Sequence, residues 1–212
     1  MKISLINAGK RFNRDWIFRN LNYEFTAGNA YAITGPNGSG KSTLLQVIGG
    51  AIAQSEGKVE FEGIRHKTQG TSEKPAVENY YQYISIAAPY LDVIEEMTVT
   101  EFLKFHQQFK PFLPTIDTKK AIAAIGLDTS AHKQIRFYSS GMKQRVKLAQ
   151  AIFSDVPCVL LDEPCTNLDS EGIALYQHLI SSYCLDRLVI VSSNDEQEYG
   201  FCKNKLSILD YK

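Results

Sequence analysis

A glycine-rich segment early in the chain contains residues that could bind the phosphates of a nucleotide. It reads Gly35-Pro36-Asn37-Gly38-Ser39-Gly40-Lys41-Ser42-Thr43 and fits the spacing G-x-x-x-x-G-K-[ST]. Glycines here let backbone N–H groups curl around phosphate oxygens, the lysine neutralises the β and γ oxygens, and the serine hydroxyl can bind Mg²⁺. An apolar strand pattern precedes the segment and a helix pattern follows, whose positive end faces the same anion. We therefore predict a phosphate loop at residues 35–43.

Two adjacent carboxylates follow an apolar run in Val159-Leu160-Leu161-Asp162-Glu163-Pro164. A buried strand that ends in Asp162 would bring this carboxylate beside the phosphate loop, where it can hold Mg²⁺ through water. Glu163 would then lie at the carboxyl edge of the sheet, where ligands of α/β folds gather, and could polarise the water that attacks the γ-phosphate. The alternative is a pair of solvated acids that cap a strand, and it fits less well next to a phosphate loop.

The elements that must position these groups alternate between strand and helix patterns. Turn signals at Ala8-Gly9 and at 27–29 separate the first strands, and the polar segment 65–79 is predicted to be a surface loop. Strands are predicted at residues 2–6, 22–25, 30–34, 58–63, 83–87, 156–161, 188–192 and 206–209. Helices are predicted at 41–48, from 98 to Phe109, at 121–125, at 139–153 and at 173–183.

This order predicts an α/β fold with a mostly parallel sheet that carries an inserted helical block. The length of 212 residues suits one domain with a subdomain, and the balance of 44% hydrophobic and 22% charged residues is ordinary for a globular protein. The formal net charge is zero, so the basic excess of a nucleic-acid binder is missing. The longest apolar runs are too short to cross a bilayer, and we expect a cytosolic protein. The four cysteines lack metal or disulfide spacing and are expected to be buried.

A third segment, Tyr138-Ser139-Ser140-Gly141-Met142-Lys143-Gln144-Arg145, resembles the signature L-S-G-G-Q-x-x-R of ABC transporters, with Tyr, Ser and Met in place of Leu, Gly and Gln. Over nearly all of its length the sequence is similar to the nucleotide-binding subunits of that family, including exporter-type and heme-exporter-like subunits. The resemblance implies a single ABC ATPase domain over 1–212. It would consist of a P-loop NTPase (RecA-like) core with an antiparallel β subdomain and an inserted helical subdomain at about 90–153.

The resemblance also implies further roles around ATP and Mg²⁺. Ser139, Ser140 and Gly141 would bind the γ-phosphate of ATP held by a second copy, so that two subunits enclose two nucleotides. Asp169, in the segment Thr166-Asn167-Leu168-Asp169, would lie at the contact between the copies. Phe12 stands where the family has an aromatic ring that stacks on adenine, although Trp16 is a rival and either ring could be core.

Two positions depart from the family pattern. After the strand at 83–87 the family has a glutamine that contacts Mg²⁺, but residues 86–91 contain none, and Gln82 comes too early. After the strand at 188–192 the family has a histidine, and Asn194 stands there instead. Asparagine can donate a hydrogen bond but cannot carry a proton or a charge. A lost transition-state contact costs on the order of 10²–10³ in rate, so turnover is expected to be slow.

The expected function is that of an ATP-hydrolysing motor subunit on the cytoplasmic face of the cell membrane. Its partners would be a second copy, or a related ATPase subunit, and a separate integral-membrane permease. The apolar stretch Pro89-Tyr90-Leu91 with Val93 and Ile94 either receives the permease or is ordinary core. The alternatives are a soluble ABC protein that acts on ribosomes or DNA, which the balanced charge disfavours, and a small-molecule kinase, which would leave the signature segment unexplained.

Overall fold

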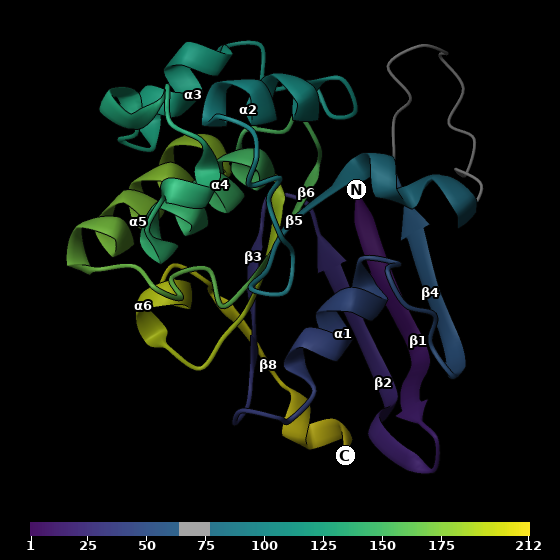
Figure 1. Cartoon of the computed structure of the whole chain (residues 1–212). Coiled ribbons are helices and arrows are strands. Elements are labelled where there is room, and N and C mark those ends of the chain that lie inside the picture. Colours follow the sequence, from purple (N-terminus) through teal and green to yellow (C-terminus); the bar gives the residue numbers. More distant parts are fainter. Residues whose placement is uncertain (64–76) are drawn as a thin grey trace.

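Two β-sheets with helices between and around them make up the structure, a computed structural model that describes residues 1–63 and 77–212 (Figure 1). Three antiparallel strands form one sheet in the order β2-β1-β4, with β1 at Lys2–Phe12, β2 at Asp15–Thr26 and β4 at Glu56–Glu62. Five strands form a parallel sheet in the order β5-β6-β7-β3-β8. Their bounds are β3 Ala30–Thr34, β5 Ile84–Ala87, β6 Cys158–Asp162, β7 Leu188–Ser192 and β8 Asn204–Ser207. The predicted α/β fold with a parallel and an antiparallel part is confirmed.

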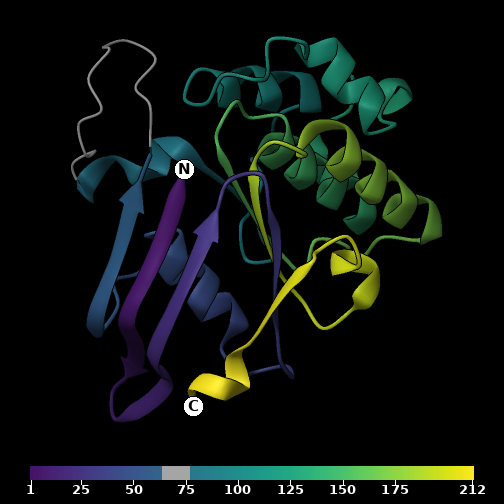
Figure 2. The same ribbon diagram turned by 180° about the vertical axis from the view of Figure 1, so that it is seen from behind.

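Helices cover both faces of the parallel sheet. On one face, α1 (Lys41–Ile48) lies between this sheet and the antiparallel one. On the other face lie α4 (Ser140–Ile152) and α5 (Ser170–Tyr183), with α2 (Val99–Gln107) and α3 (Thr118–Ala124) stacked beyond them (Figure 2). A short helix α6 (Glu196–Tyr199) follows β7. The 3₁₀ turns are η1 Val77–Tyr83, η2 Asp128–Ser130, η3 Ile135–Phe137 and η4 Ile208–Tyr211.

The side chains of each parallel strand alternate between the two faces of the sheet and so divide the core into two clusters. On β6, Val159 and Leu161 belong to the cluster under α4 and α5, whereas Cys158 and Leu160 belong to the cluster around α1. Successive side chains of a strand point to opposite faces, so a strand covered on both sides is apolar throughout. All five residues of β6 are buried, which fixes from both sides the strand that ends in Asp162.

Several sequence expectations are wrong in detail, and the second strand begins at Asp15 and not near residue 22. Ala8-Gly9 is not a turn: β1 continues to Phe12 through irregular register, and Asn7 takes a left-handed φ of 47° there. A bulge admits such a residue without ending the strand. Helix α2 ends at Gln107, so Phe109 lies beyond it. The last strand ends at Ser207, where η4 begins. The predicted loop at 65–79 lies mostly outside the described residues, apart from 77–79 at the start of η1.

Among the helices in the described part of the chain, none combines the length and the apolar character that a membrane span requires.

Candidate nucleotide site

The carboxyl edge of the parallel sheet brings the predicted motifs together. Asp162 at the end of β6 is paired with Ser192 at the end of β7, and Ile33 of β3 is paired with the same Ser192. The backbone N–H of Glu163 donates to the Ser192 carbonyl at 2.9 Å, and that of Ser193 donates to Ile33 at 3.2 Å. The phosphate loop after β3, the carboxylates after β6 and the segment 193–195 after β7 therefore leave the sheet side by side.

The phosphate loop packs closely against a side chain of β2. Gly40 has φ of 97°, and a Cβ atom at this position would lie 2.2 Å from the Ile17 side chain. Only glycine combines that backbone conformation with such a close approach. Helix α1 begins at Lys41 and has no side-chain cap on its first turn, so its amide groups face the loop. The start of α1 thus offers uncapped amide groups to an anion, and phosphate binding by this loop stays a prediction.

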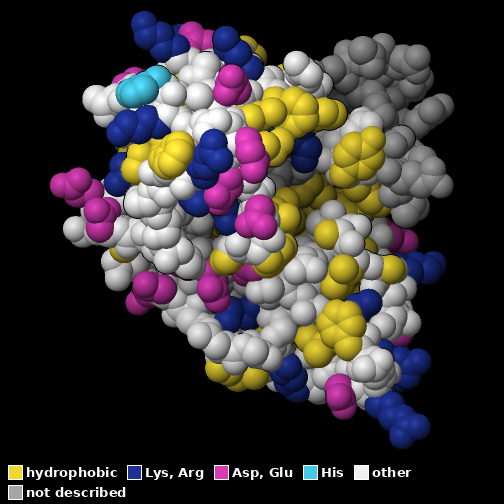
Figure 3. Space-filling view, in the orientation of Figure 1, with side chains coloured by type: hydrophobic (Ala, Val, Ile, Leu, Met, Phe, Trp, Pro, Cys, Tyr) yellow, Lys and Arg dark blue, Asp and Glu magenta, His cyan; other side chains and the backbone are white. Residues whose placement is uncertain are grey.

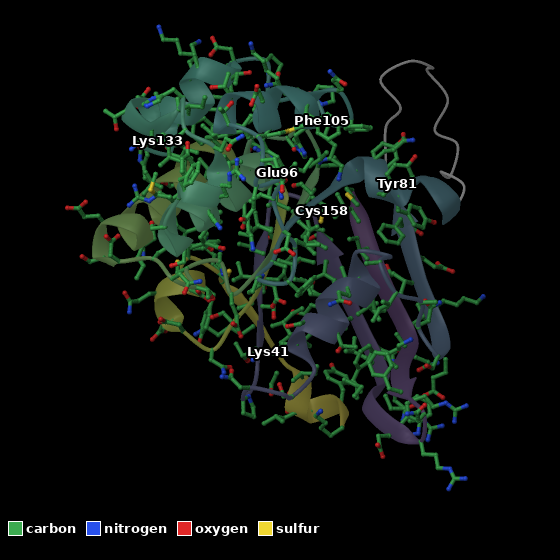
Figure 4. All side chains as sticks on the ribbon, viewed as in Figure 1. Lys41, Tyr81, Glu96, Phe105, Lys133 and Cys158 are labelled. Atoms are coloured by element: carbon green, nitrogen blue, oxygen red, sulfur yellow. The ribbon has the colours of Figure 1, made fainter. Side chains whose placement is uncertain are left out.

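Lys41, labelled in Figure 4, is 4% exposed, and its ammonium lies within hydrogen-bond distance of the loop. Its Nζ donates to the carbonyls of Gly35 at 2.8 Å and Pro36 at 3.3 Å. An ammonium in this place can transfer its hydrogen bonds to phosphate oxygens that the loop encloses. Asn194 also reaches the loop, because its Nδ2 donates to Oδ1 of Asn37 at 2.7 Å.

Three buried oxygens at this edge have no hydrogen-bond partner among the described residues: Ser39 Oγ, Asp162 Oδ1 and Ser192 Oγ. Unpaired buried polar atoms are rare, and each calls for an explanation such as a ligand or ion. A hydroxyl on Ser42 and a carboxylate on Asp162 are hard oxygen donors of the kind that Mg²⁺ prefers. The residues present therefore fit a nucleotide with Mg²⁺.

Glu163 is half-buried and takes a left-handed backbone conformation with φ of 42°. Such strain in a residue that is not glycine persists only where the surrounding structure imposes it, and it clusters at functional sites. The loop after it is held by Glu198, whose Oε1 accepts from the Cys165 N–H at 2.6 Å. Burial raises the pKa of Glu198, and the nearby Asp195 and Glu163 carboxylates act in the same direction. Nothing in the sequence distinguishes Glu198 from its acidic neighbours.

The signature segment and the 166–169 segment meet at a second site. Ser139 caps α4 and accepts from the Met142 N–H at 3.2 Å, which leaves the first amides of the helix pointing outward. A Cβ atom at Gly141 would lie 2.9 Å from the Asn167 carbonyl, so glycine permits this approach. Arg145 lies 3.7 Å from the carboxylate of Asp169, which caps α5. These residues, together with the exposed Ser140, border a cavity of about 370 Å³.

The cavity at the signature has no phosphate-loop residue among the described residues that line it. Its serine hydroxyl, helix amides and guanidinium are groups that can bind an anion. The two sites are connected within the chain by Gln144, whose Nε2 donates to the carbonyl of Pro164 at 2.7 Å in the buried interior. The chain thus carries two separate surfaces whose groups can bind phosphate.

The two candidate adenine-stacking rings differ in exposure. Phe12, at the end of β1, is 49% exposed, with the ammonium of Lys10 5.0 Å from the ring centroid. Trp16 has the guanidinium groups of Arg11 and Arg19 over its ring at 5.5 Å and 4.4 Å. The Phe12 ring is thus the more accessible of the two, and its role stays a prediction.

The apolar residues of the stretch 89–94 differ in burial. Val93 belongs to the core, while Tyr90 and Ile94 are exposed.

Comparisons with known proteins agree on the family. A family model described as ABC transporter matches residues 18–166. The chain is 33% identical over 210 residues to the cytochrome c biogenesis ATP-binding export protein CcmA of Rhizobium meliloti, with 97% of this chain and 96% of that protein covered. It is 26% identical over 198 residues to an uncharacterised ABC transporter ATP-binding protein of Bacillus subtilis, which covers 92% of this chain and 87% of that one.

Solved structures with the same fold include a putative ABC transporter ATP-binding protein from Pyrococcus furiosus. Its TM-score is 0.80 at 19% identity, and all of both chains is covered. A dimeric bacterial ABC transporter cassette gives a TM-score of 0.79 at 22% identity and covers 97% of this chain and 93% of its own. The same kind of cassette, in a dimeric post-hydrolysis state bound to ADP and Pi, gives a TM-score of 0.80 at 22% identity. It covers 97% of this chain and 93% of its own.

Proposed function

This chain belongs to the ABC transporter family as an ATP-binding subunit, and from that premise we propose that it hydrolyses MgATP as a pair of cassettes acting on a separate permease. The observation that supports the proposal is the presence, in one chain, of two surfaces whose groups can bind phosphate. The phosphate loop would hold ATP, and the signature cavity would contact the γ-phosphate of ATP held by another copy. We keep the division of the domain 1–212 into a core and a helical arm at about 90–153 as part of this proposal.

In this mechanism each described group has one task. Lys41 and the amides of 35–43 bind the phosphates, and Phe12 stacks on the base. Ser42 and Asp162 would hold Mg²⁺, which supplies charge neutralisation between the phosphates. Glu163 orients and activates the attacking water, and its strained backbone fixes that position. Asn194, which already contacts Asn37, donates a hydrogen bond to the transferred phosphate without carrying charge.

The second copy completes the site. Ser139, Ser140 and Gly141 of one copy would contact the γ-phosphate bound by the other, while Asp169 would lie at the interface. We propose that the pair sits on the cytoplasmic face of the membrane, bound to a permease. Export as the direction of transport rests on the relatives that are named export proteins. The partner in the pair is a second copy of this chain or a related ATPase subunit.

The test is ATP-dependent dimerisation of a Glu163→Gln variant, measured by size-exclusion chromatography with light scattering. The variant should hydrolyse ATP at least 100-fold more slowly than the wild type, because a transition-state contact is lost. It should therefore trap a dimer with MgATP and return to the monomer mass with ADP. A matched control is Glu196→Gln, which removes an exposed carboxylate that faces Lys205.

Adding Lys41→Ala to Glu163→Gln should abolish the ATP-induced dimer. A Glu163→Gln variant that stays monomeric in MgATP, although it binds the nucleotide, would contradict the paired mechanism. Steady ATP hydrolysis by that monomer would instead favour a phosphoryl-transfer enzyme that works alone.

A further inference from the structure

The segment that follows β8 packs against the phosphate loop. Ile208 of η4 is fully buried, and its side chain lies against two glycines of the loop. A Cβ atom at Gly35 would lie 2.8 Å from this side chain, and one at Gly40 would lie 3.4 Å from it. Figures 1 and 2 both show η4 beside the connection from β3 to α1. Buried packing thus fixes where the chain after η4 runs relative to the loop.

Lys212, directly after η4, joins the phosphate loop to β2 through its ammonium. Its Nζ donates to the Ser39 carbonyl at 2.6 Å and to the Ile17 carbonyl at 2.9 Å. Ser39 belongs to the loop and is 6% exposed, and Ile17 is the β2 residue whose side chain approaches Gly40. Hydrogen bonds from a charged donor are roughly twice as strong as neutral ones. Two backbone segments that already touch are therefore also joined by a cation.

The positive charge of Lys212 is not neutralised within the described part of the chain. No carboxylate there forms an ion pair with its ammonium, and its two acceptors are neutral carbonyls. The Ser39 carbonyl belongs to the same planar peptide unit as the Gly40 N–H. A cation on the oxygen polarises this unit, so the N–H becomes a stronger donor. The amides of this loop are the groups that would bind phosphate.

We infer that Lys212 is a positioning residue for nucleotide phosphates. It fixes the peptide between Ser39 and Gly40, strengthens the Gly40 N–H as a donor and adds a positive charge beside the loop. The inference rests on the proposed ATP-binding function and assigns to it a residue outside the phosphate-loop motif. Lys212 does not duplicate Lys41, whose ammonium contacts the carbonyls at the start of the loop. Because Lys212 acts through its charge, its contribution to nucleotide affinity should fall as salt is added.

The experiment measures the Kd of ATP by calorimetry, at low and at high salt, for the wild type, Lys212→Met and Lys212→Arg. Lys212→Met keeps an apolar stem and removes the charge, whereas Lys212→Arg keeps a charged donor. One partly exposed charge changes affinity by up to about fivefold. At low salt, Lys212→Met should therefore bind ATP about fivefold more weakly than the wild type, and Lys212→Arg within about twofold of it. At about 1 M salt, where the Debye length is about 3 Å, Lys212→Met should also come within about twofold.

Lys120→Met is the matched control. Lys120 is likewise exposed and donates from Nζ to a backbone carbonyl, that of Thr115 at 3.2 Å. It belongs to α3, which lies at the far end of the molecule from η4 (Figures 1 and 2). The Kd of ATP should be unchanged in this variant at both salt concentrations. A second readout needs no nucleotide: the NMR signal of the Gly40 amide should shift in Lys212→Met and stay in place in Lys120→Met.

The outcomes separate the two proposals. If Lys212→Met binds ATP as tightly as the wild type, the inference is wrong while the proposed function stands. A loss of the same size at both salt concentrations, or one that Lys212→Arg shares, would also overturn the inference, because packing and not charge would then be responsible. An unmoved Gly40 signal in Lys212→Met would show that the ammonium does not act on the loop. A wild type that binds no ATP would overturn the proposed function and the inference together.

Discussion

A single hydrogen bond joins Asn194 to the phosphate loop, from Nδ2 to Oδ1 of Asn37 at 2.7 Å. The position thus lies within reach of a phosphate held by the loop, but the amide group cannot gain charge there. An imidazole at the same point could donate a hydrogen bond and also carry a proton. We therefore expect the residue type, more than its position, to limit the contact with phosphate.

We expect Asn194→His to raise the steady-state rate of ATP hydrolysis about 10-fold, because a charge-assisted hydrogen bond is roughly twice as strong as a neutral one. The rate is measured at saturating MgATP with phosphate release as the readout. Asn29→His is the control, since Asn29 precedes β3 at the opposite end of the sheet from the loop. An unchanged or lower rate in Asn194→His would show that the asparagine is already suited to this site.

The residues of the candidate site follow from the sequence to different degrees. Lys41, Ser42, Asp162 and Glu163 belong to contiguous motifs whose spacing reflects their chemistry, and all lie at one sheet edge in the fold. Glu198 could not be predicted in the same way. Its Oε1 accepts from the backbone N–H of Cys165, which lies far from it in the sequence, and only the fold brings the two together.

At the scale of elements, two helix ends are joined by one buried guanidinium. Arg187, which precedes β7, donates from Nη1 to the Ser154 carbonyl at 3.0 Å and from Nη2 to the Ile152 carbonyl at 2.7 Å, at the end of α4. Its Nε donates at 2.9 Å to Tyr183, the last residue of α5. Carbonyls at a helix C-terminus lack partners within the helix, and a cation there also interacts favourably with the helix dipole.

Replacing Arg187 with Met should destabilise the protein by about 2–3 kcal/mol, because buried carbonyls lose a charged donor. Urea unfolding followed by circular dichroism measures the change. Arg136→Met is the control, since Arg136 is exposed and its hydrogen bonds go to Gln134, only two residues away. If the two variants unfold at the same urea concentration, Arg187 does not hold the helix ends together.

Elements with strong local signals were predicted well, whereas those shaped by neighbours were not. The structure has α1 at Lys41–Ile48, β3 at Ala30–Thr34 and β7 at Leu188–Ser192, all as predicted. Two glycines end α1, and apolar runs define the two strands. The extent of β1 depends instead on pairing with β2 and β4, which carries the strand past Asn7. Pairing partners are distant in sequence, so a local pattern does not reveal them.

For the molecule as a whole, the exposed apolar side chains on and around α2 offer a surface to the proposed permease partner. Tyr90, Ile94, Phe105 and Phe109 are each between 38% and 70% exposed. Phe105, labelled in Figure 4, lies on α2, and Figure 3 shows apolar side chains gathered around this helix on the same face. Exposed apolar groups that cluster in this way mark surfaces for binding another protein.

Ile94→Asp should release a co-purifying membrane protein from this chain. Placing a charge in an apolar contact costs more binding free energy than removing the apolar side chain alone. The amount of membrane protein recovered with this chain should therefore fall at least 10-fold. The readout is the ratio of the two polypeptides after gentle solubilisation of membranes and affinity purification. Ile94 is chosen because the neighbouring Val93 belongs to the core, where a charge would unfold the protein.

Leu209→Asp is the control, as Leu209 is 51% exposed on η4 near the C-terminus, on the side opposite the arm (Figures 1 and 2). Equal loss in both variants would show a general effect of charge on the preparation. A wild-type chain recovered with ribosomes or nucleic acid, and without a membrane protein, would instead support a soluble ABC protein.

The two-sided burial of β6 also bears on how the sequence can change over generations. A strand with one open face can accept substitutions on that face, but Val159, Leu160 and Leu161 all pack against one core or the other. A change of volume at any of them disturbs packing directly beneath Asp162 and Glu163. These three residues should therefore diverge as slowly as the carboxylates they support. Among homologues, invariance at this strand would record a requirement for packing and would not by itself identify a residue that takes part in the reaction.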